Sequence, residues 1–561
     1  MRVKLSSAAR AFGALAVLLG LAVPAAAQIQ PPPAPPPVDQ ASGPVRQLTI
    51  DEAVALGLEN NLNLRVERIN PQLQDANIVQ ARSAFSPNLF GQFNYNNADT
   101  PPSSLLTGTR EILQSDRSYG NVGVSQQLPW WGTNYQVTWD GQRSTSNSVY
   151  NNFNPSLGSS LQVLFSQPLL RNFSVDAARQ QLLVSRANRE ISDIDLRNSV
   201  VSTVRNVRAA FWNLAYAVAN LKAQQQSLDL SRQMLKDNRT RVEVGTMAPI
   251  DIVEAEAEVA RNEETVIVAE SNIRQAEDLL RVQIFNEAQP DYWRTRIEPV
   301  YDQALLAAAP VDAETAVQNA LAKRADLQSA KKQIETTNLN IRYYRNQLLP
   351  QVDLQASFLG DAIGGQELIR EPGFPPGPVT GEVYYPFGSV VGDALTYEYP
   401  TWQLGVQVSY PLGTSAAKAN VTRARLQLEQ SQLQIQNLEL QIATQVRDAA
   451  RQVNTNTKRI EATRAARVLA ERRLEAEQKK FGVGMSTSFL VFQAQRDLTT
   501  SRNNELQALV DYAKSRVDFE ALQEGTISGT GITLPGAGNV LATGVGSQTA
   551  GAATQASQMR R

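Results

Sequence analysis

The side chains that most often carry enzyme chemistry are missing from this sequence. Its 561 residues include no cysteine and no histidine. Their absence removes thiol nucleophiles, imidazole bases and the usual zinc and haem ligands. No nucleophile elbow, phosphate-binding loop or dinucleotide-binding glycine pattern takes their place. We therefore expect a protein that is not an enzyme and that has no catalytic residues, no cofactor and no bound metal.

Two sharp breaks between long helical patterns organise the rest of the chain. Gly245 and Gly484 each suit the left-handed residue that ends a helix, and Pro249 suits the first turn of the helix that follows. The two breaks match at one constant offset, which pairs Val244 with Val483, Gly245 with Gly484, and Ala255 with Ala494. The chain therefore contains two helical hairpins, whose glycines we expect to be turn residues first and contact residues second.

The two halves of the chain also repeat each other outside the hairpins. A second constant offset pairs Ala53 with Ala316, Leu58 with Leu321, Leu64 with Leu327, and Pro87 with Pro350. We therefore divide the chain into a first repeat (47–285), an inter-repeat segment interrupted by prolines (286–311) and a second repeat (312–524). Each repeat begins with a helical pattern, over 49–83 in the first, and leads through strands into a long hairpin.

The two ends of the sequence differ from the repeats in composition. Arg2 and Lys4 precede an apolar run and a small-residue cleavage site, which predicts a cleaved signal peptide (1–27). A proline-rich linker (28–46) follows it. The tail (525–561) is a Gly/Ala/Ser-rich segment that we expect to be disordered. The net charge of -1 provides no field for nucleic acid, so we expect no nucleic-acid partner.

Alternating apolar and polar residues separate the helical patterns at 88–166 and 351–410. In the second repeat, Val352, Leu354 and Ala356 alternate with polar residues, and a glycine- and proline-rich loop (360–400) is expected before the next strand. After the signal peptide no apolar run is long enough for a membrane helix, so membrane insertion would have to use strands. Each half has too few strands to close a barrel, and several chains must then share one.

Residues 47–524 resemble the TolC-type outer-membrane efflux proteins. The resemblance rests on the opening Leu48–Val54, on Gln167–Leu170, on Arg324–Leu327 and on the paired Val-Gly hairpins. It implies a membrane α+β fold, internally duplicated, in which a homotrimer shares one transmembrane β-barrel continued by a long periplasmic α-helical coiled-coil barrel. It also implies the exit duct of a tripartite efflux or type I secretion system, in the outer membrane of a Gram-negative-type cell and extending into the periplasm.

The resemblance further implies which partners and residues act in export. The partners are outer-membrane lipid, a periplasmic adaptor (membrane fusion) protein and an inner-membrane pump of the RND or ABC type. Contacts with the adaptor are expected at the hairpin tips: Val244, Gly245, Thr246, Val483, Gly484 and Met485. Candidates for a pore constriction follow the tips: Asp251, Glu254, Phe489, Leu490 and Gln493.

The constriction departs from the family pattern. Family members place acids after the second glycine, where three copies make an electronegative ring, but this chain has Leu490 and Gln493 there. In the family, the acid at the position of Asp251 serves mainly in ties between helices. A ring of Leu490 beside Phe489 and Phe492 would close by excluding water, or these groups pack between neighbouring helices.

Two further alternatives follow from the sequence. Residues 133–166 look like a hairpin added to the two strands that a family member commonly has in each repeat, and it either widens the barrel or lies outside it. For the whole chain, the rival interpretation is a periplasmic coiled-coil adaptor or scaffold without its own barrel. Neither the substrate nor the class of pump follows from these patterns.

Overall fold

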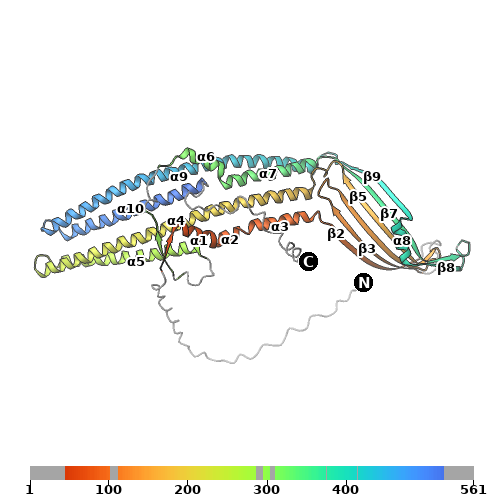
Figure 1. The fold of residues 1–561 in the computed structure, drawn as a ribbon, viewed down its shortest axis with the longest axis horizontal. Helices are drawn as coiled ribbons and strands as arrows, with labels where there is room; N and C mark the ends of the chain where they lie inside the picture. The colour runs from red at the N-terminus through yellow and green to blue at the C-terminus, as the bar shows by residue number, and fades with distance from the viewer. Residues whose placement is uncertain are drawn as a thin grey trace, which may run out of the picture.

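The chain folds into a sheet and a set of long helices that lie end to end (Figure 1). The computed structural model describes residues 45–101, 112–285, 293, 295–302, 310–374, 376–413 and 415–523. The signal peptide (1–27), nearly all of the linker (28–46) and the tail (525–561) expected from the sequence lie outside the described residues.

Four helices form the two long hairpins. α4 (Ala177–Glu243) turns back into α5 (Ile250–Ile284), and α9 (Ala416–Gly482) turns back into α10 (Ser488–Leu522). α4 and α9 each have 67 residues, and such a helix is about 100 Å long. α10 packs against α4 as well as against α9, so the two hairpins lie side by side. Within the described residues, no helix combines the length and the apolar character needed to cross a membrane.

Seven strands form one antiparallel sheet at the other end of the molecule. Its order is β2-β3-β4-β5-β7, and β7 then pairs with β8 along one part of its length and with β9 along another. The strand bounds are β2 Asn88–Thr100, β3 Leu113–Gln127, β4 Asn134–Ser146, β5 Phe153–Pro168, β7 Gln351–Arg370, β8 Val379–Tyr385 and β9 Tyr399–Ser409. The added hairpin (133–166) forms β4 and β5 between β3 and β7, so it is part of the sheet.

Adjacent rows of the strand register separate apolar from polar side chains. One row crosses six strands and is apolar throughout: Leu89, Val124, Val137, Val163, Phe358 and Trp402. The neighbouring row is polar except at one position: Asn88, Ser125, Gln136, Leu164, Ser357 and Gln403. Successive side chains of a strand point to opposite faces, so these rows define an apolar face and a polar face.

The expected loop over 360–400 is wrong for most of its length. β7 continues to Arg370, β8 follows, and the short helix α8 (Phe387–Thr396) packs against β5 and β7. A Cβ at Gly360 would lie 2.5 Å from the carbonyl oxygen of Ala394, and one at Gly364 would lie 2.6 Å from Val390. The glycines that indicated a loop therefore allow a helix to approach the strand closely.

Shorter elements join the sheet to the hairpins. β1 (Val45–Thr49) and β6 (Arg296–Val300) form a parallel pair, in which β1 crosses the expected boundary between the linker and the first repeat and β6 lies in the inter-repeat segment. Each of these strands has only five residues and lies next to or contains a proline, so its alternation is too short to predict a strand. The helix expected over 49–83 is divided into α1 (Ile50–Asn60), α2 (Leu62–Glu67) and α3 (Asn70–Ser83), and its counterparts in the second repeat are α6 (Ala313–Lys323) and α7 (Ala325–Asn346).

The break between α1 and α2 is made by a buried polar side chain. Asn61 accepts a hydrogen bond from the backbone N–H of Leu64 (3.1 Å), which caps α2. Its amide nitrogen donates to the backbone carbonyl of Gln283 at the end of α5 (3.1 Å). The apolar spacing continues through this break, and for that reason periodicity alone did not locate it.

The largest apolar cluster lies where β1, β6, α1, α4 and α5 meet. Phe211 and Leu214 of α4 are fully buried there, together with Leu280 and Ile284 of α5. The ring of Phe211 contacts Trp212 edge to face at a centroid distance of 5.8 Å. This cluster fixes the first hairpin at a level between its tip and the sheet.

We predict that Phe211→Ala destabilises the protein by about 3–5 kcal/mol, because it opens a cavity in this cluster. Thermal unfolding of the detergent-solubilised protein measures the effect, with Val244→Ala at an exposed tip as the control. Equal unfolding temperatures for the two variants would contradict the assignment of this cluster as the core.

Candidate functional site

Both hairpin tips use the same backbone turn. Gly245 has φ +77° and Gly484 has φ +78°. The N–H of Thr246 donates to the carbonyl of Arg241, and the N–H of Met485 donates to that of Lys480, both at 2.8 Å. A Cβ at either glycine would meet nothing within 4 Å, so the left-handed backbone and not crowding requires glycine. The N–H of Gly245 also donates to the carbonyl of Val242 (2.9 Å) and that of Gly484 to the carbonyl of Phe481 (3.2 Å), which completes the Schellman motif at each helix end.

The predicted contact residues are exposed around these turns. Val244 and Val483 are each 72% exposed and Met485 is 78% exposed. Thr246 is also exposed, and its hydroxyl donates to the carbonyl of Arg241 (2.9 Å). The tips lie at the end of the molecule farthest from the sheet (Figure 1). Exposed apolar side chains at the end of a rigid hairpin are suited to contact another protein.

Two contacts join the tips of one chain to each other. The guanidinium of Arg241 lies 4.6 Å from the centroid of the Phe481 ring, and its Nη1 donates to the carbonyl of Phe481 (3.4 Å). The hydroxyl of Ser488 donates to Asp251 Oδ1 (2.9 Å). Asp251 is therefore engaged with the second hairpin. Sequence reasoning missed the pairing of Arg241 with Phe481, because the two residues are far apart in the chain.

The remaining constriction candidates lie on different sides of their helices. Phe489 and Leu490 are 52% and 41% exposed, Gln493 is half-buried, and Glu254 of α5 is exposed. Phe492 is only 3% exposed, so of the two alternatives left open for it by the sequence, the structure shows packing between helices and not a place beside the exposed Phe489. The helical period places Phe492 with the buried side chains of Ser488 and Gln495, which face the rest of the chain.

Farther from the tips, buried polar side chains join the two hairpins. Gln495 of α10 donates to the carbonyl of Ser227 of α4 (3.0 Å). Arg496 of α10 pairs with Glu258 of α5 (3.0 Å), and Glu258 is 5% exposed. The Arg496 guanidinium also lies 6.0 Å from the centroid of the Phe489 ring. These contacts can form only when α10 lies at this position along α4 and α5, so they fix α10 against the first hairpin.

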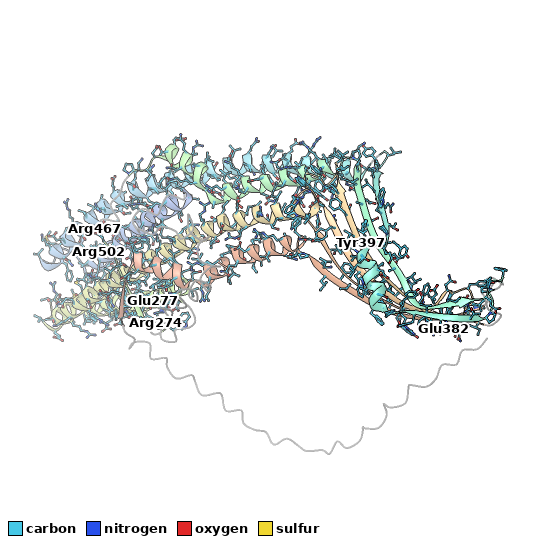
Figure 2. The ribbon with its side chains drawn as sticks, turned by 45° about the vertical axis from the view of Figure 1, so that its right-hand side comes forward. Arg274, Glu277, Glu382, Tyr397, Arg467 and Arg502 are labelled. Carbon is cyan, nitrogen blue, oxygen red and sulfur yellow. The ribbon has the colours of Figure 1, made fainter. Side chains whose placement is uncertain are left out.

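The second hairpin has a charged cluster of its own. Arg467 of α9 and Arg502 of α10 both donate to Glu471 Oε1, at 2.9 and 3.3 Å, and both arginines are labelled in Figure 2. Burial raises the pKa of the Glu471 carboxyl, but the hydrogen bonds from the two arginines outweigh it and keep that pKa below its ordinary value. The cluster therefore holds α9 and α10 together with Glu471 ionised.

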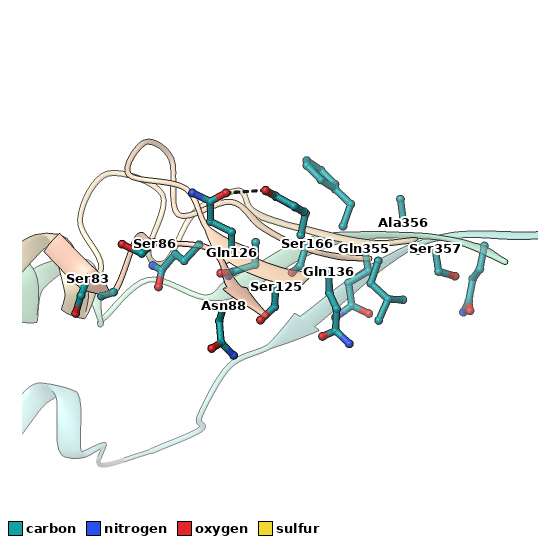
Figure 3. A pocket seen from close by; sticks show the side chains of 18 residues that line it. Ser83, Ser86, Asn88, Ser125, Gln126, Gln136, Ser166, Gln355, Ala356 and Ser357 are labelled. Atoms are coloured by element: carbon teal, nitrogen blue, oxygen red, sulfur yellow. Dashed lines mark hydrogen bonds between the residues drawn. The ribbon is translucent and has the colours of Figure 1, made fainter. Parts of the chain in front are cut away.

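The polar face of the sheet is hollowed near the helices. A cavity of about 800 Å³ is lined mainly by serine, glutamine and asparagine, among them Ser125, Gln136, Ser166, Gln355 and Ser357 (Figure 3). Six strands contribute to this lining, which includes the whole polar row defined above. No side chain in the lining carries a charge. Across the described residues, no group of three or more potential acidic ligands is placed to hold a metal ion.

This arrangement of helical hairpins and sheet is shared with solved outer membrane channels. The chain belongs to the outer membrane efflux protein family, whose model matches residues 54–283 and 316–523. The protein is therefore an outer-membrane exit duct for efflux. The expectation of a TolC-type protein is confirmed.

Known proteins are similar to this chain over most of its length. Outer membrane efflux protein BepC of Brucella suis biovar 1 (strain 1330) is 22% identical over 463 residues, 82% of each chain. The Campylobacter jejuni CmeC outer membrane channel has a TM-score of 0.60 and 16% identity, and the match covers 84% of this chain and 85% of that one. The open state of the Neisseria gonorrhoeae MtrE outer membrane channel has a TM-score of 0.58 and 16% identity, with 85% and 89% covered.

We predict that Arg241→Ala loosens the second tip, because it removes about 1 kcal/mol of cation–π and hydrogen-bond stabilisation from Phe481. Local opening should then rise about fivefold. Hydrogen–deuterium exchange of the peptide around Phe481 measures this opening in the purified protein.

The matched control is Arg239→Ala, which removes only an ion pair with Glu256 whose two side chains are about half exposed. Exchange around Phe481 should stay at the wild-type level in this control. The same exchange in both variants would show that the Arg241 contact does not hold the tip.

Proposed function

We propose that three copies of the chain close one transmembrane barrel and one periplasmic helical tube. Through it, small molecules or proteins pass from an inner-membrane pump to the exterior, as in a tripartite efflux or type I secretion system. The observation that carries the proposal is the sheet. Six strands share an apolar row and a polar row, and the two edge strands lack a partner on one side among the described residues.

The two faces of the sheet match the two surfaces of a membrane channel. The apolar row would face lipid, and Leu89 and Trp402 at its two ends are more than 70% exposed in one chain. The polar face would line the duct, where the uncharged cavity offers hydrogen bonds without a preference for either sign of charge. With β4 and β5 inside the sheet, the shared barrel would be wider than one with two strands from each repeat.

The N-terminal sequence is consistent with export of the chain to the outer membrane. Residues 1–27 have the pattern of a cleaved signal peptide, so the mature chain would begin near the linker. The helices would then extend into the periplasm. The rival function, a periplasmic coiled-coil adaptor or scaffold, gives no reason for a sheet with one apolar face.

The hairpin tips are the surface that we assign to the adaptor. Val244, Val483 and Met485 would insert between adaptor helices, while Gly245 and Gly484 set the turn that presents them. The adaptor would join the duct to a pump of the RND or ABC type. The pump, and not the uncharged duct, would choose the substrate.

The closed end of the tube would be apolar. Leu490 and Phe489 are exposed in one chain and lie just after the second tip, with Gln493 beside them. Three copies of Leu490 on the tube axis would exclude water without a ring of charge. Asp251 is bound to Ser488, which supports a role in tying the hairpins together, and Glu254 is an exposed acid three residues farther along α5.

We predict that the resting conductance in planar bilayers is insensitive to multivalent cations added on the periplasmic side, and that Leu490→Ser raises it by wetting the constriction. Val483→Ser, at an exposed tip, serves as the control and should leave conductance unchanged. Strong cation block that disappears in Asp251→Ala would refute the apolar closure and place an acidic ring on the first repeat.

We predict that Gly484→Pro abolishes efflux although trimers still form, because proline cannot adopt the positive φ of this turn. Cells carrying it should be as sensitive to toxic substrates as cells without the gene. Gly482→Ala is the matched control, since a Cβ there meets nothing within 4 Å and alanine suits the end of α9. Normal efflux by Gly484→Pro trimers would contradict the proposal that the tip docks on the adaptor.

A further inference from the structure

The helix α8 is placed on the sheet in a way that the export function does not explain. It follows β8 and precedes β9, and it lies against β5 and β7 near the end of the sheet that is farther from the long helices (Figure 1). Figure 2 labels Tyr397, which ends α8 in the left-handed conformation with φ +57°.

α8 covers the apolar face of the sheet and not the polar face. Its buried residues, Val390 and Ala394, pack against Leu157 of β5 and Ala362 of β7. Ala362 lies an even number of residues from Phe358, so both side chains point to the apolar face. The side of α8 away from the sheet therefore faces whatever surrounds the barrel, outside the duct.

The level of α8 is the boundary between apolar and polar residues on this face. Its first residue, Phe387, contacts the ring of Trp139 at a centroid distance of 6.4 Å, and its ring lies over Gly141. The next side chains along β4 on the same face are Arg143 and Thr145, which are polar. In a membrane, this change marks the transition from the acyl chains to the headgroups.

The outward surface of α8 has room for lipid chains, and its two hydroxyls are hydrogen-bonded to nearby backbone carbonyls. A Cβ added at Gly388 or at Gly392 would meet nothing within 4 Å, and Leu395 is 52% exposed. The hydroxyl of Ser389 donates to the carbonyl of Pro386 (2.8 Å) and that of Thr396 to the carbonyl of Asp393 (3.2 Å). Asp393 is the one charged residue of the helix, and it is half-buried at the side of α8.

Exposed aromatic side chains flank the helix on both sides. Tyr384 and Tyr385 precede it, and Tyr399 and Trp402 follow it; all four are exposed. Tyrosine and tryptophan gather at membrane–water interfaces, where an apolar ring and a polar tip meet both phases. Trp402 also belongs to the apolar row, so the residues that follow α8 in the chain lead directly into the proposed lipid-facing surface.

We propose that α8 is an interfacial helix seated in the outer leaflet, with its outward surface against lipid acyl chains and its first residue, Phe387, at the headgroup boundary. This inference rests on the proposed barrel, whose apolar face would contact lipid. A 10-residue helix is too short to span a bilayer, but it can lie in the interface plane with its backbone hydrogen bonds satisfied. Three such helices around one barrel would resist its displacement along the membrane normal.

The absence of cysteine from the chain allows a direct test with single nitroxide labels. Full-length protein is reconstituted in phospholipid vesicles with a label at Leu395→Cys on α8, and collision with oxygen is compared with collision with a water-soluble nickel chelate. Gly392→Cys repeats the measurement at a site where the new side chain has space. Leu404→Cys on the apolar face of β9 and Gln407→Cys on its polar face are the matched references.

The two α8 labels should give oxygen-to-nickel ratios that are shifted toward the ratio at Leu404 and away from that at Gln407. If the α8 labels gave ratios like that at Gln407 while the Leu404 label still reported lipid, the role of α8 would be overturned and the proposed barrel would not. Strong spin–spin broadening at Leu395 would also overturn it, since a second copy and not lipid would then cover the helix. Nickel access at Leu404 itself would instead count against the proposed barrel.

Discussion

Unpaired backbone groups on β2 and β9 are the constraint on which the rest of the architecture depends. Among the described residues, β2 pairs only with β3 and β9 pairs only with β7, so each leaves a row of N–H and C=O groups open. In water such an edge invites aggregation, and in lipid each unsatisfied group costs several kcal/mol. The proposed assembly removes both edges at once, because β9 of one copy would pair with β2 of the next.

The helical part meets a different constraint, since a helix in the wall of the proposed water-filled tube can bury only narrow stripes of side chains. The long helices accordingly bury many small or polar side chains, such as Ser227 and Ser231 of α4 and Gln495 of α10. A buried polar group is costly unless it finds its partner, so these contacts favour one register of the hairpins over its alternatives. The tie of Asp251 to Ser488 and the stacking of Arg241 on Phe481 extend the same register to the tips.

The features that sequence could predict are those with a local physical signal. The period of 3.6 predicted α4, α5, α9 and α10, the alternation predicted β2 to β5, β7 and β9, and positive φ explained why Gly245 and Gly484 recur. Features that depend on distant contacts were missed. The glycines of 360–400 indicated a loop because the helix that packs on them is visible only in three dimensions. Whether Phe492 joins the constriction or packs between helices stayed open because its burial depends on how α10 meets its neighbours.

The central claim, that the open edges of three sheets pair to close one barrel, is tested most directly by cross-linking across those edges. Gln92→Cys on β2 and Gln407→Cys on β9 place thiols on the polar faces of the two edge strands, which four further strands separate within one sheet. A short flexible bis-maleimide cannot span that separation of about 20–25 Å. In native outer membranes, the account predicts a ladder on denaturing gels that ends at covalent trimers. A ladder that continues beyond three chains, or monomers alone after complete labelling, would contradict it.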